Sequence, residues 1–118
     1  MPELQMGVIE ARFADIIWES EPVSGAALVK KAEADFGWKR TTTYTVLKRL
    51  CDKGIFRNDG GTVTSRMSRE DYYARRSNQY VEETFAGSLP AFFAAFTRGK
   101  PLTEEEREEI RRMIDETE

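Results

Sequence analysis

Histidine is absent from this 118-residue chain, and Cys51 is its single cysteine. These two shortages exclude disulfide bonds within the chain, zinc sites built from thiolates and imidazoles, and the Ser-His or Cys-His pairs of nucleophilic enzymes. No apolar run approaches the roughly 18 residues of a membrane-spanning helix, and no signal-peptide pattern opens the sequence. We therefore expect a cytoplasmic protein without catalysis, cofactor, metal or membrane insertion.

Positive charge is outnumbered by negative charge over most of the chain but is concentrated in its middle. The net charge is −3, yet residues 38–76 carry 10 basic and 4 acidic side chains, a net +6. The segments before and after are both net acidic. One basic segment in an otherwise acidic protein is typical of a nucleic-acid-binding face. The length indicates one domain, or one domain with a short appendage.

A helix predicted between Trp38 and Gly54 lies at the centre of the basic segment. At about 100° per residue its apolar side chains share one arc, and short hydroxyls and cations share the other. Hydroxyls can bind base edges or phosphates, a threonine methyl can contact a thymine methyl, and cations can neutralise phosphates. The alternative is a threonine N-cap followed by a solvated amphipathic helix. The candidate DNA-binding residues here are Lys39, Arg40, Thr41, Thr42, Thr45, Lys48 and Arg49.

Two further helices are predicted before this one. Apolar residues spaced from Ile9 to Ile17 indicate an amphipathic helix over about residues 7–20, and Ser24 is a typical N-cap for a second helix that ends at Gly37. Three helices joined by short turns are typical of a helix-turn-helix.

A β-hairpin is predicted directly after the third helix. Residues 55–58 and 62–67 have strand character, and residues 59–61 (DGG) form a turn between them. A hairpin at this place is the wing of a winged helix. Arg57 and Arg66 would then grip the DNA backbone or the minor groove. The alternative is that these arginines only discourage edge-to-edge strand pairing.

The C-terminal segment is predicted to form three helices, beginning near Ser68, Ser88 and Thr103. The second of these is too rich in aromatic residues for a surface helix of a small monomer. We therefore expect a dimerisation element that buries its apolar stripe against a second copy. The alternative is that these helices fold back on the first three helices of the same chain. The expected interface residues are Tyr80, Phe85, Leu89, Phe92, Phe93, Phe96, Ile110, Met113 and Ile114.

Several runs of the sequence resemble the penicillinase repressor family. They are MGVIE (6–10), IIW (16–18), PVS (22–24), GW (37–38), TTYTVLKRL (42–50) and KGI (53–55), and the stretch over residues 42–54 is the most specific. The resemblance implies a homodimeric winged-helix repressor that binds a palindromic operator in double-stranded DNA and blocks transcription. By position, it implies base and phosphate contacts from Thr41, Thr42, Tyr44, Thr45 and Lys48.

The resemblance also implies ways of relieving repression. Repressors of β-lactam resistance in this family are cleaved at an Asn-Phe bond through a membrane sensor protease pathway. The matching bond here joins Ala95 and Phe96, which keeps the phenylalanine but not the asparagine. The copper-sensing members carry clustered cysteines in the tail, whereas residues 77–118 contain none.

Together these patterns predict a mainly α fold with a small β-hairpin. Residues 1–76 are expected to form a winged helix-turn-helix DNA-binding domain and residues 77–118 a C-terminal helical dimerisation region. The predicted function is a bacterial transcriptional repressor, of antibiotic-resistance or cell-envelope stress genes. One alternative is a ligand-sensing winged-helix regulator of another family, with a cavity among Tyr72, Tyr73, Phe85 and Phe92. The other is a winged helix used as a protein-interaction module.

Overall fold

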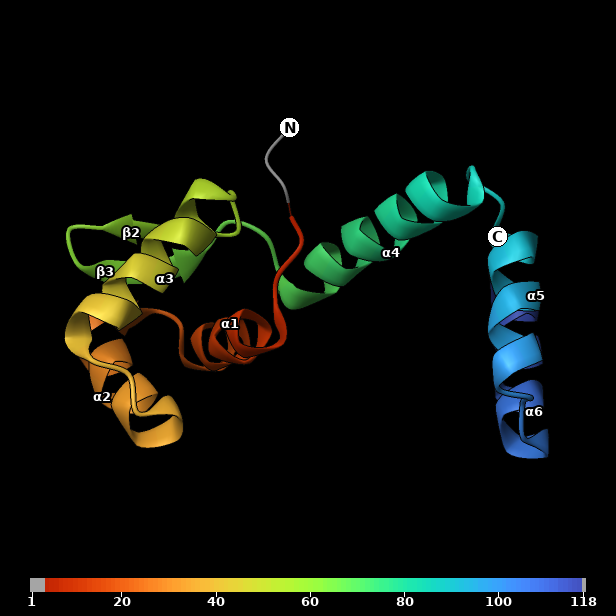
Figure 1. The fold of residues 1–118 in the computed structure, drawn as a ribbon, viewed down its shortest axis with the longest axis horizontal. Coiled ribbons are helices and arrows are strands. Elements are labelled where there is room, and N and C mark those ends of the chain that lie inside the picture. The colour runs from red at the N-terminus through yellow and green to blue at the C-terminus, as the bar shows by residue number, and fades with distance from the viewer. Residues whose placement is uncertain (1–3, 118) are drawn as a thin grey trace. The chain divides into compact units, whose positions relative to one another are not determined.

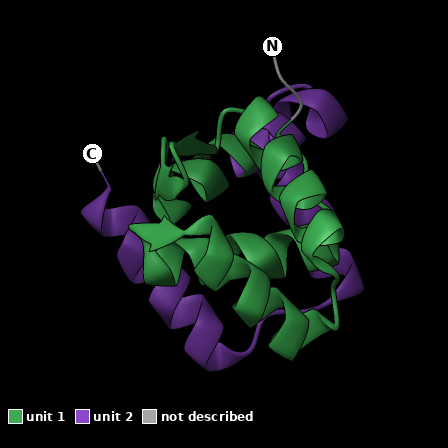
Figure 2. Ribbon diagram, turned by 90° about the vertical axis from the view of Figure 1, so that its left-hand side faces the viewer, with its two compact units in different colours: residues 1–76 green, residues 77–118 purple. Residues whose placement is uncertain are grey.

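Residues 4–117 are described by the computed structural model, which contains helices and one small antiparallel sheet (Figure 1). The chain divides into two compact units, residues 1–76 and 77–118 (Figure 2). This content confirms the predicted fold class, a winged helix-turn-helix. The elements in chain order are α1 (Val8–Ser20), β1 (Val23–Ser24), α2 (Gly25–Phe36), α3 (Arg40–Asp52), β2 (Phe56–Asp59), β3 (Thr62–Ser65), α4 (Arg69–Phe85), α5 (Leu89–Gly99) and α6 (Glu104–Glu116).

Helices α2 and α5 begin, and α2 ends, where local sequence signals predict, whereas α3 begins after Lys39 and not at a threonine N-cap. The Ser24 hydroxyl accepts a hydrogen bond from the Ala27 N–H at the start of α2, and Ser88 accepts one from Ala91 at the start of α5. Gly37 ends α2 with a φ of 69°, a left-handed conformation that suits glycine. These bonds satisfy backbone groups that the ends of a helix otherwise leave unpaired.

The sheet has three strands in the order β1-β3-β2, all antiparallel. The hairpin was predicted, but β1 was not: its two residues pair only with β3, Val23 opposite Val63. The hairpin is also shorter than predicted, because β3 ends at Ser65 and leaves Arg66 outside the strand. Asp59 belongs to β2, so the turn itself is Gly60-Gly61, and both glycines have positive φ. We call β2 and β3 with this turn the wing.

The core of residues 1–76 lies where α1, α2 and α3 meet the sheet. Each element places fully buried side chains there, among them Ile17 from α1, Leu28 from α2, Leu50 from α3 and Val63 from β3. The buried side of α3 consists of the residues predicted from its periodicity: Thr43, Val46, Leu47 and Leu50. The helix is therefore fixed in rotation about its own axis.

Three packed aromatic side chains attach the first turn of α4 to this core. The Trp18 ring lies 5.2 Å from the Phe56 ring and 5.8 Å from the Tyr72 ring, between centroids. The indole N–H of Trp18 donates to the Met67 carbonyl at 3.0 Å, and the Tyr72 hydroxyl donates to the Leu4 carbonyl at 2.7 Å. Burial raises the pKa of the Tyr72 hydroxyl above its usual value, which favours the protonated form that makes this hydrogen bond.

The second unit contains no fully buried residue in α5 or α6. Its internal packing comes from four rings that form an aromatic cluster. Phe92 lies at the centre, with ring centroids 5.6 Å from Phe85 and 6.1 Å from both Tyr80 and Phe96. The N-terminus of α6 is fixed by a capping box in which Thr103 and Glu106 each bond the other's backbone N–H.

The Glu21 carboxylate joins the end of α1 to the wing and provides a test of this fold. It accepts hydrogen bonds at 2.8 Å from both the backbone N–H and the hydroxyl of Ser65. We expect Glu21→Ala to lower the free energy of unfolding by about 1–2 kcal/mol, because the strand N–H loses its charged acceptor. Glu21→Gln keeps an acceptor and should lose less. Urea denaturation measures both, and equal losses would contradict the assignment.

Candidate nucleic-acid interface

The solvent-facing side of α3 presents short hydroxyls and cations. Thr41, Thr42, Thr45 and Lys48 are all exposed there, opposite the buried side of the helix. Lys39 and Arg40, at the start of the helix, are exposed as well. The helix therefore offers hydrogen-bonding groups in its centre and positive charge at both ends of the exposed face. Such a surface matches the major groove and the phosphates beside it.

Most cations towards the end of α3 already have an acidic partner. The Lys48 ammonium lies 3.0 Å from the Asp52 carboxylate. The Glu10 carboxylate on α1 forms ion pairs with both Arg49, at 3.7 Å, and Lys53, at 3.4 Å. Lys53 is only 17% exposed, which makes it a contact between α1 and α3. Arg49 is half exposed but faces Glu10, so this predicted DNA-binding residue also helps to hold the two helices together.

Tyr44 is half-buried rather than presented on the exposed face. Its ring packs on Gly25, where a Cβ would lie 2.9 Å from the tyrosine hydroxyl and 3.0 Å from a ring carbon. Gly25 is thus the residue that lets α2 approach α3 this closely. The guanidinium carbon of Arg40 lies 5.5 Å from the Tyr44 ring centroid, a cation–π contact. Tyr44 therefore packs two helices together and supports Arg40 from beneath.

The wing carries one cation on its outer surface. Arg57 is exposed and lies 3.5 Å from Asp59, two residues further along the same strand. Its backbone pairs with Thr64 of β3. Arg66 follows β3, is exposed, and has its N–H bonded to the Ile55 carbonyl at the base of the wing. The two arginines therefore lie at the end of the wing that joins α3, while the glycine turn is at the other end.

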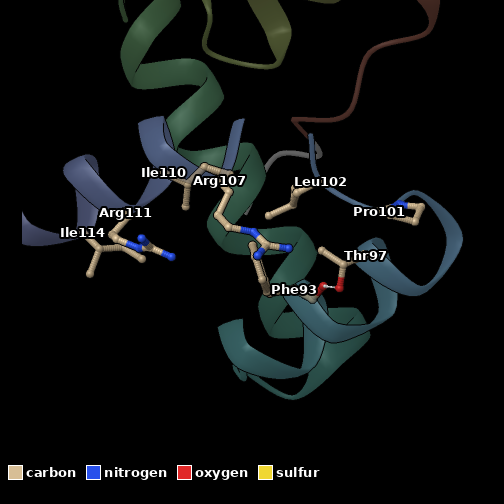
Figure 3. A pocket seen from close by; sticks show the side chains of 8 residues that line it. All are labelled: Phe93, Thr97, Pro101, Leu102, Arg107, Ile110, Arg111 and Ile114. Atoms are coloured by element: carbon tan, nitrogen blue, oxygen red, sulfur yellow. Dashed lines mark hydrogen bonds between the residues drawn. The ribbon is translucent and has the colours of Figure 1, made fainter. Parts of the chain in front are cut away.

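A groove of about 530 Å³ lies between α5 and α6 within the second unit. Phe93, Ile110 and Ile114 form part of its lining, and Figure 3 shows the Arg107 side chain extending among the lining residues. A second groove of about 400 Å³ has a wholly apolar lining that shares Phe93 and adds Leu89. Five large apolar side chains of α5 and α6 are exposed: Leu89, Phe93, Phe96, Met113 and Ile114. We call these five residues the open apolar face.

Of the remaining predicted interface residues, three are half-buried and Tyr80 is exposed. Phe85 and Phe92 are half-buried in the aromatic cluster, and Ile110 is half-buried in the grooves. Tyr80 is 46% exposed although it contacts Phe92. Ala95 is exposed in the middle of α5, next to Phe96.

Comparison with known proteins gives this arrangement a family. The sequence model described as penicillinase repressor matches residues 6–116, nearly the whole chain. The chain belongs to the penicillinase repressor family. It is 23% identical over 116 residues to a penicillinase repressor of Bacillus licheniformis, an alignment that covers 95% of this chain and 91% of that protein.

Membership of the penicillinase repressor family makes this protein a transcriptional regulator of the repressor class and not an enzyme. Within residues 4–117 no helix is long and apolar enough to cross a membrane. Cys51, the single thiol, is partly buried beside the wing, and burial followed by the nearby Asp52 charge raises its pKa. A thiol kept protonated in this way is a poor nucleophile.

The sequence analysis did not predict the roles of three residues at this interface: Glu10, Gly25 and Asp59. Glu10 lies 39 positions from Arg49, and nothing in the sequence links them. Gly25 directly follows an N-cap serine, which is a weak signal for a close helix contact. Asp59 was assigned only to a turn, although its position two residues after Arg57 in a strand places both side chains on one face.

The Asp59 carboxylate beside Arg57 suggests a substitution that strengthens DNA binding. We expect Asp59→Asn to raise the affinity for random duplex DNA by roughly threefold, because one negative charge near the phosphates is removed. Fluorescence anisotropy at low salt measures the change. Asp115→Asn in α6 makes the same change in net charge and should have no effect. An affinity unchanged by Asp59→Asn would place the wing away from DNA.

Proposed function

We propose that this protein represses transcription by binding a palindromic operator in double-stranded DNA as a homodimer, with α3 reading the major groove. The observation that carries the proposal is the exposed face of α3. Its outer side has hydroxyls and cations, and its inner side is buried in the core. A helix held in this way keeps its outer side chains at a constant orientation, which base recognition requires.

The phosphate contacts are assigned to the cations around this face. Lys39, Arg40 and Lys48 flank the threonines on α3, and Arg57 and Arg66 lie on or beside the base of the wing. Arg49 is assigned a smaller share because Glu10 already binds it. Tyr44 acts on DNA indirectly, by supporting Arg40. Direct base contacts are assigned to Thr41, Thr42 and Thr45.

Homodimerisation is proposed through the open apolar face of residues 77–118. Leu89, Met113 and Ile114 are between 58% and 66% exposed, which is unusual for three large apolar side chains in a unit of this size. Burying them against the same face of a second copy would form a two-fold interface. A dimer also presents two recognition helices, and a single helix gains too little over non-specific binding to select an operator.

Relief of repression by proteolysis fits the same interface. A cut between Ala95 and Phe96 would divide α5 and detach Phe96 and α6, with Met113 and Ile114, from the DNA-binding unit. We therefore include a membrane sensor protease pathway among the proposed partners. The Bacillus licheniformis relative is a penicillinase repressor, which supports antibiotic-resistance or cell-envelope stress genes as the regulated set.

Operator binding should depend strongly on salt. If each protomer neutralises about three to five phosphates, the plot of log affinity against log salt should have a slope of about −5 to −9 for the dimer. Titrations of a duplex selected from a random pool, at several salt concentrations, measure this slope. A slope near zero would refute the DNA-binding role of the basic segment. Failure to retard any DNA would support the protein-interaction alternative.

The dimer proposal is tested best at Phe96 and Ile114. Phe96→Glu and Ile114→Glu each bury an unpaired charge on both sides of the two-fold axis, which we expect to weaken association by about 3–5 kcal/mol. Sedimentation should show folded monomers, and operator affinity should fall at least tenfold. Ala91→Glu, an exposed position on the same helix, is the matched control. Phe92 is a poor choice because it is half-buried at the centre of the aromatic cluster of its own chain, whereas Phe96 lies at the edge of that cluster and is 49% exposed. Folded dimers with normal affinity would exclude this face as the interface.

A further inference from the structure

The threonines on the exposed face of α3 differ in what their hydroxyls already bind. The Thr45 hydroxyl donates to the Thr41 carbonyl at 2.8 Å, one turn earlier in the helix. Thr42 lies in the first turn, so the residue four positions before it is outside the helix and offers no aligned carbonyl. Within residues 4–117 the Thr42 side chain has no hydrogen-bond partner. The two side chains are chemically identical but present different groups to solvent.

The bonded hydroxyl leaves the methyl group as the free branch of Thr45. A threonine Cβ carries two branches, and the branch bonded to the helix backbone is turned towards that backbone. The Thr45 hydroxyl proton is already donated to the Thr41 carbonyl, so Thr45 cannot donate to a base without breaking this internal hydrogen bond. The unbonded hydroxyl of Thr42 can still donate and accept. We therefore expect Thr45 to make an apolar contact and Thr42 a polar one.

Among the described residues, the side chains beside Thr45 leave it exposed. Thr42 and Lys48 flank it on the exposed face, one turn to each side, and both are exposed. The Lys48 ammonium is drawn towards the next turn by Asp52, at 3.0 Å, which is away from Thr45. The middle of the recognition surface is therefore a small apolar spot bordered by polar groups.

We propose that Thr45 recognises an A·T base pair by contact of its methyl group with the 5-methyl group of thymine, while Thr42 recognises its target through its hydroxyl. This inference rests on the proposed function, because it requires that α3 lies in the major groove. Thymine is the only base of unmodified operator DNA that presents a methyl group there. Each half-site of the palindrome then contains one thymine that pairs with Thr45 of one protomer.

The test removes the hydroxyl and the methyl group of each threonine in separate variants. Thr45→Val keeps the methyl and removes the hydroxyl, whereas Thr45→Ser keeps the hydroxyl and removes the methyl. Affinity is measured on an operator selected from a random pool, and on copies in which single thymines are replaced by deoxyuridine. Thr42→Val and Thr42→Ser are the matched controls on the same helix. Random DNA reports non-specific binding, and circular dichroism reports folding.

We expect opposite results at the two positions. Thr45→Val should bind the operator within about twofold of the wild type, and Thr45→Ser should bind about three- to tenfold more weakly, as expected for loss of one buried methyl contact. Deoxyuridine at the contacted position should weaken the wild type by a similar factor and Thr45→Ser no further. Thr42→Val should lose affinity, and Thr42→Ser should keep it.

Two results would overturn the inference while leaving the proposed function intact. One is a Thr45→Val protein that loses operator affinity while Thr45→Ser binds normally, which would assign recognition to the hydroxyl. The other is equal sensitivity to deoxyuridine in the wild type and in Thr45→Ser, which would separate Thr45 from every thymine methyl. A wild-type protein that selects no sequence from the pool would instead overturn the proposed function, and this inference with it.

Discussion

Burial of one side of α3 is the constraint on which the rest of residues 1–76 depends. Four side chains of this helix, including Leu47 and Leu50, are enclosed by α1, α2 and the sheet, so its opposite side must face outwards. The contacts around it serve the same end: Glu10 holds the end of the helix, and the ring of Tyr44 rests on α2. Recognition chemistry can then be carried by short side chains, because the backbone beneath them does not turn.

Much of this fold could be predicted because the deciding signals are local. Ser24, Gly37 and Ser88 act within one helical turn, and the buried arc of α3 follows from a repeat over a dozen residues. Features that depend on distant partners escaped prediction. Strand β1 is too short to have a pattern and exists only because Val63 lies opposite Val23. Likewise, no local signal distinguishes Arg49, held by Glu10, from Lys48, which faces solvent.

The apolar residues of the second unit divide into two groups that the sequence does not separate. Phe85 and Phe92 contact each other at a centroid distance of 5.6 Å and give the unit its internal packing. Leu89, Met113 and Ile114 remain largely in solvent. Helical periodicity places Phe85, Leu89 and Phe92 in one stripe, because it reports direction around an axis and not the distance to a neighbour. An assembly surface and a small core can therefore share a single sequence pattern.

The contact between Gly25 and Tyr44 has a consequence for how sequences of this kind can diverge. A Cβ at position 25 would lie 2.9 Å from the tyrosine hydroxyl. Any larger residue there therefore requires the Tyr44 ring to move, or a smaller side chain to replace it. Moving the ring also withdraws support from Arg40 above it. Positions 25 and 44 are thus expected to vary together among related chains, with a side chain gained on α2 matched by one reduced on α3. A packing contact between two helices thereby limits which pairs of residues these positions can hold, and with them the support beneath residue 40.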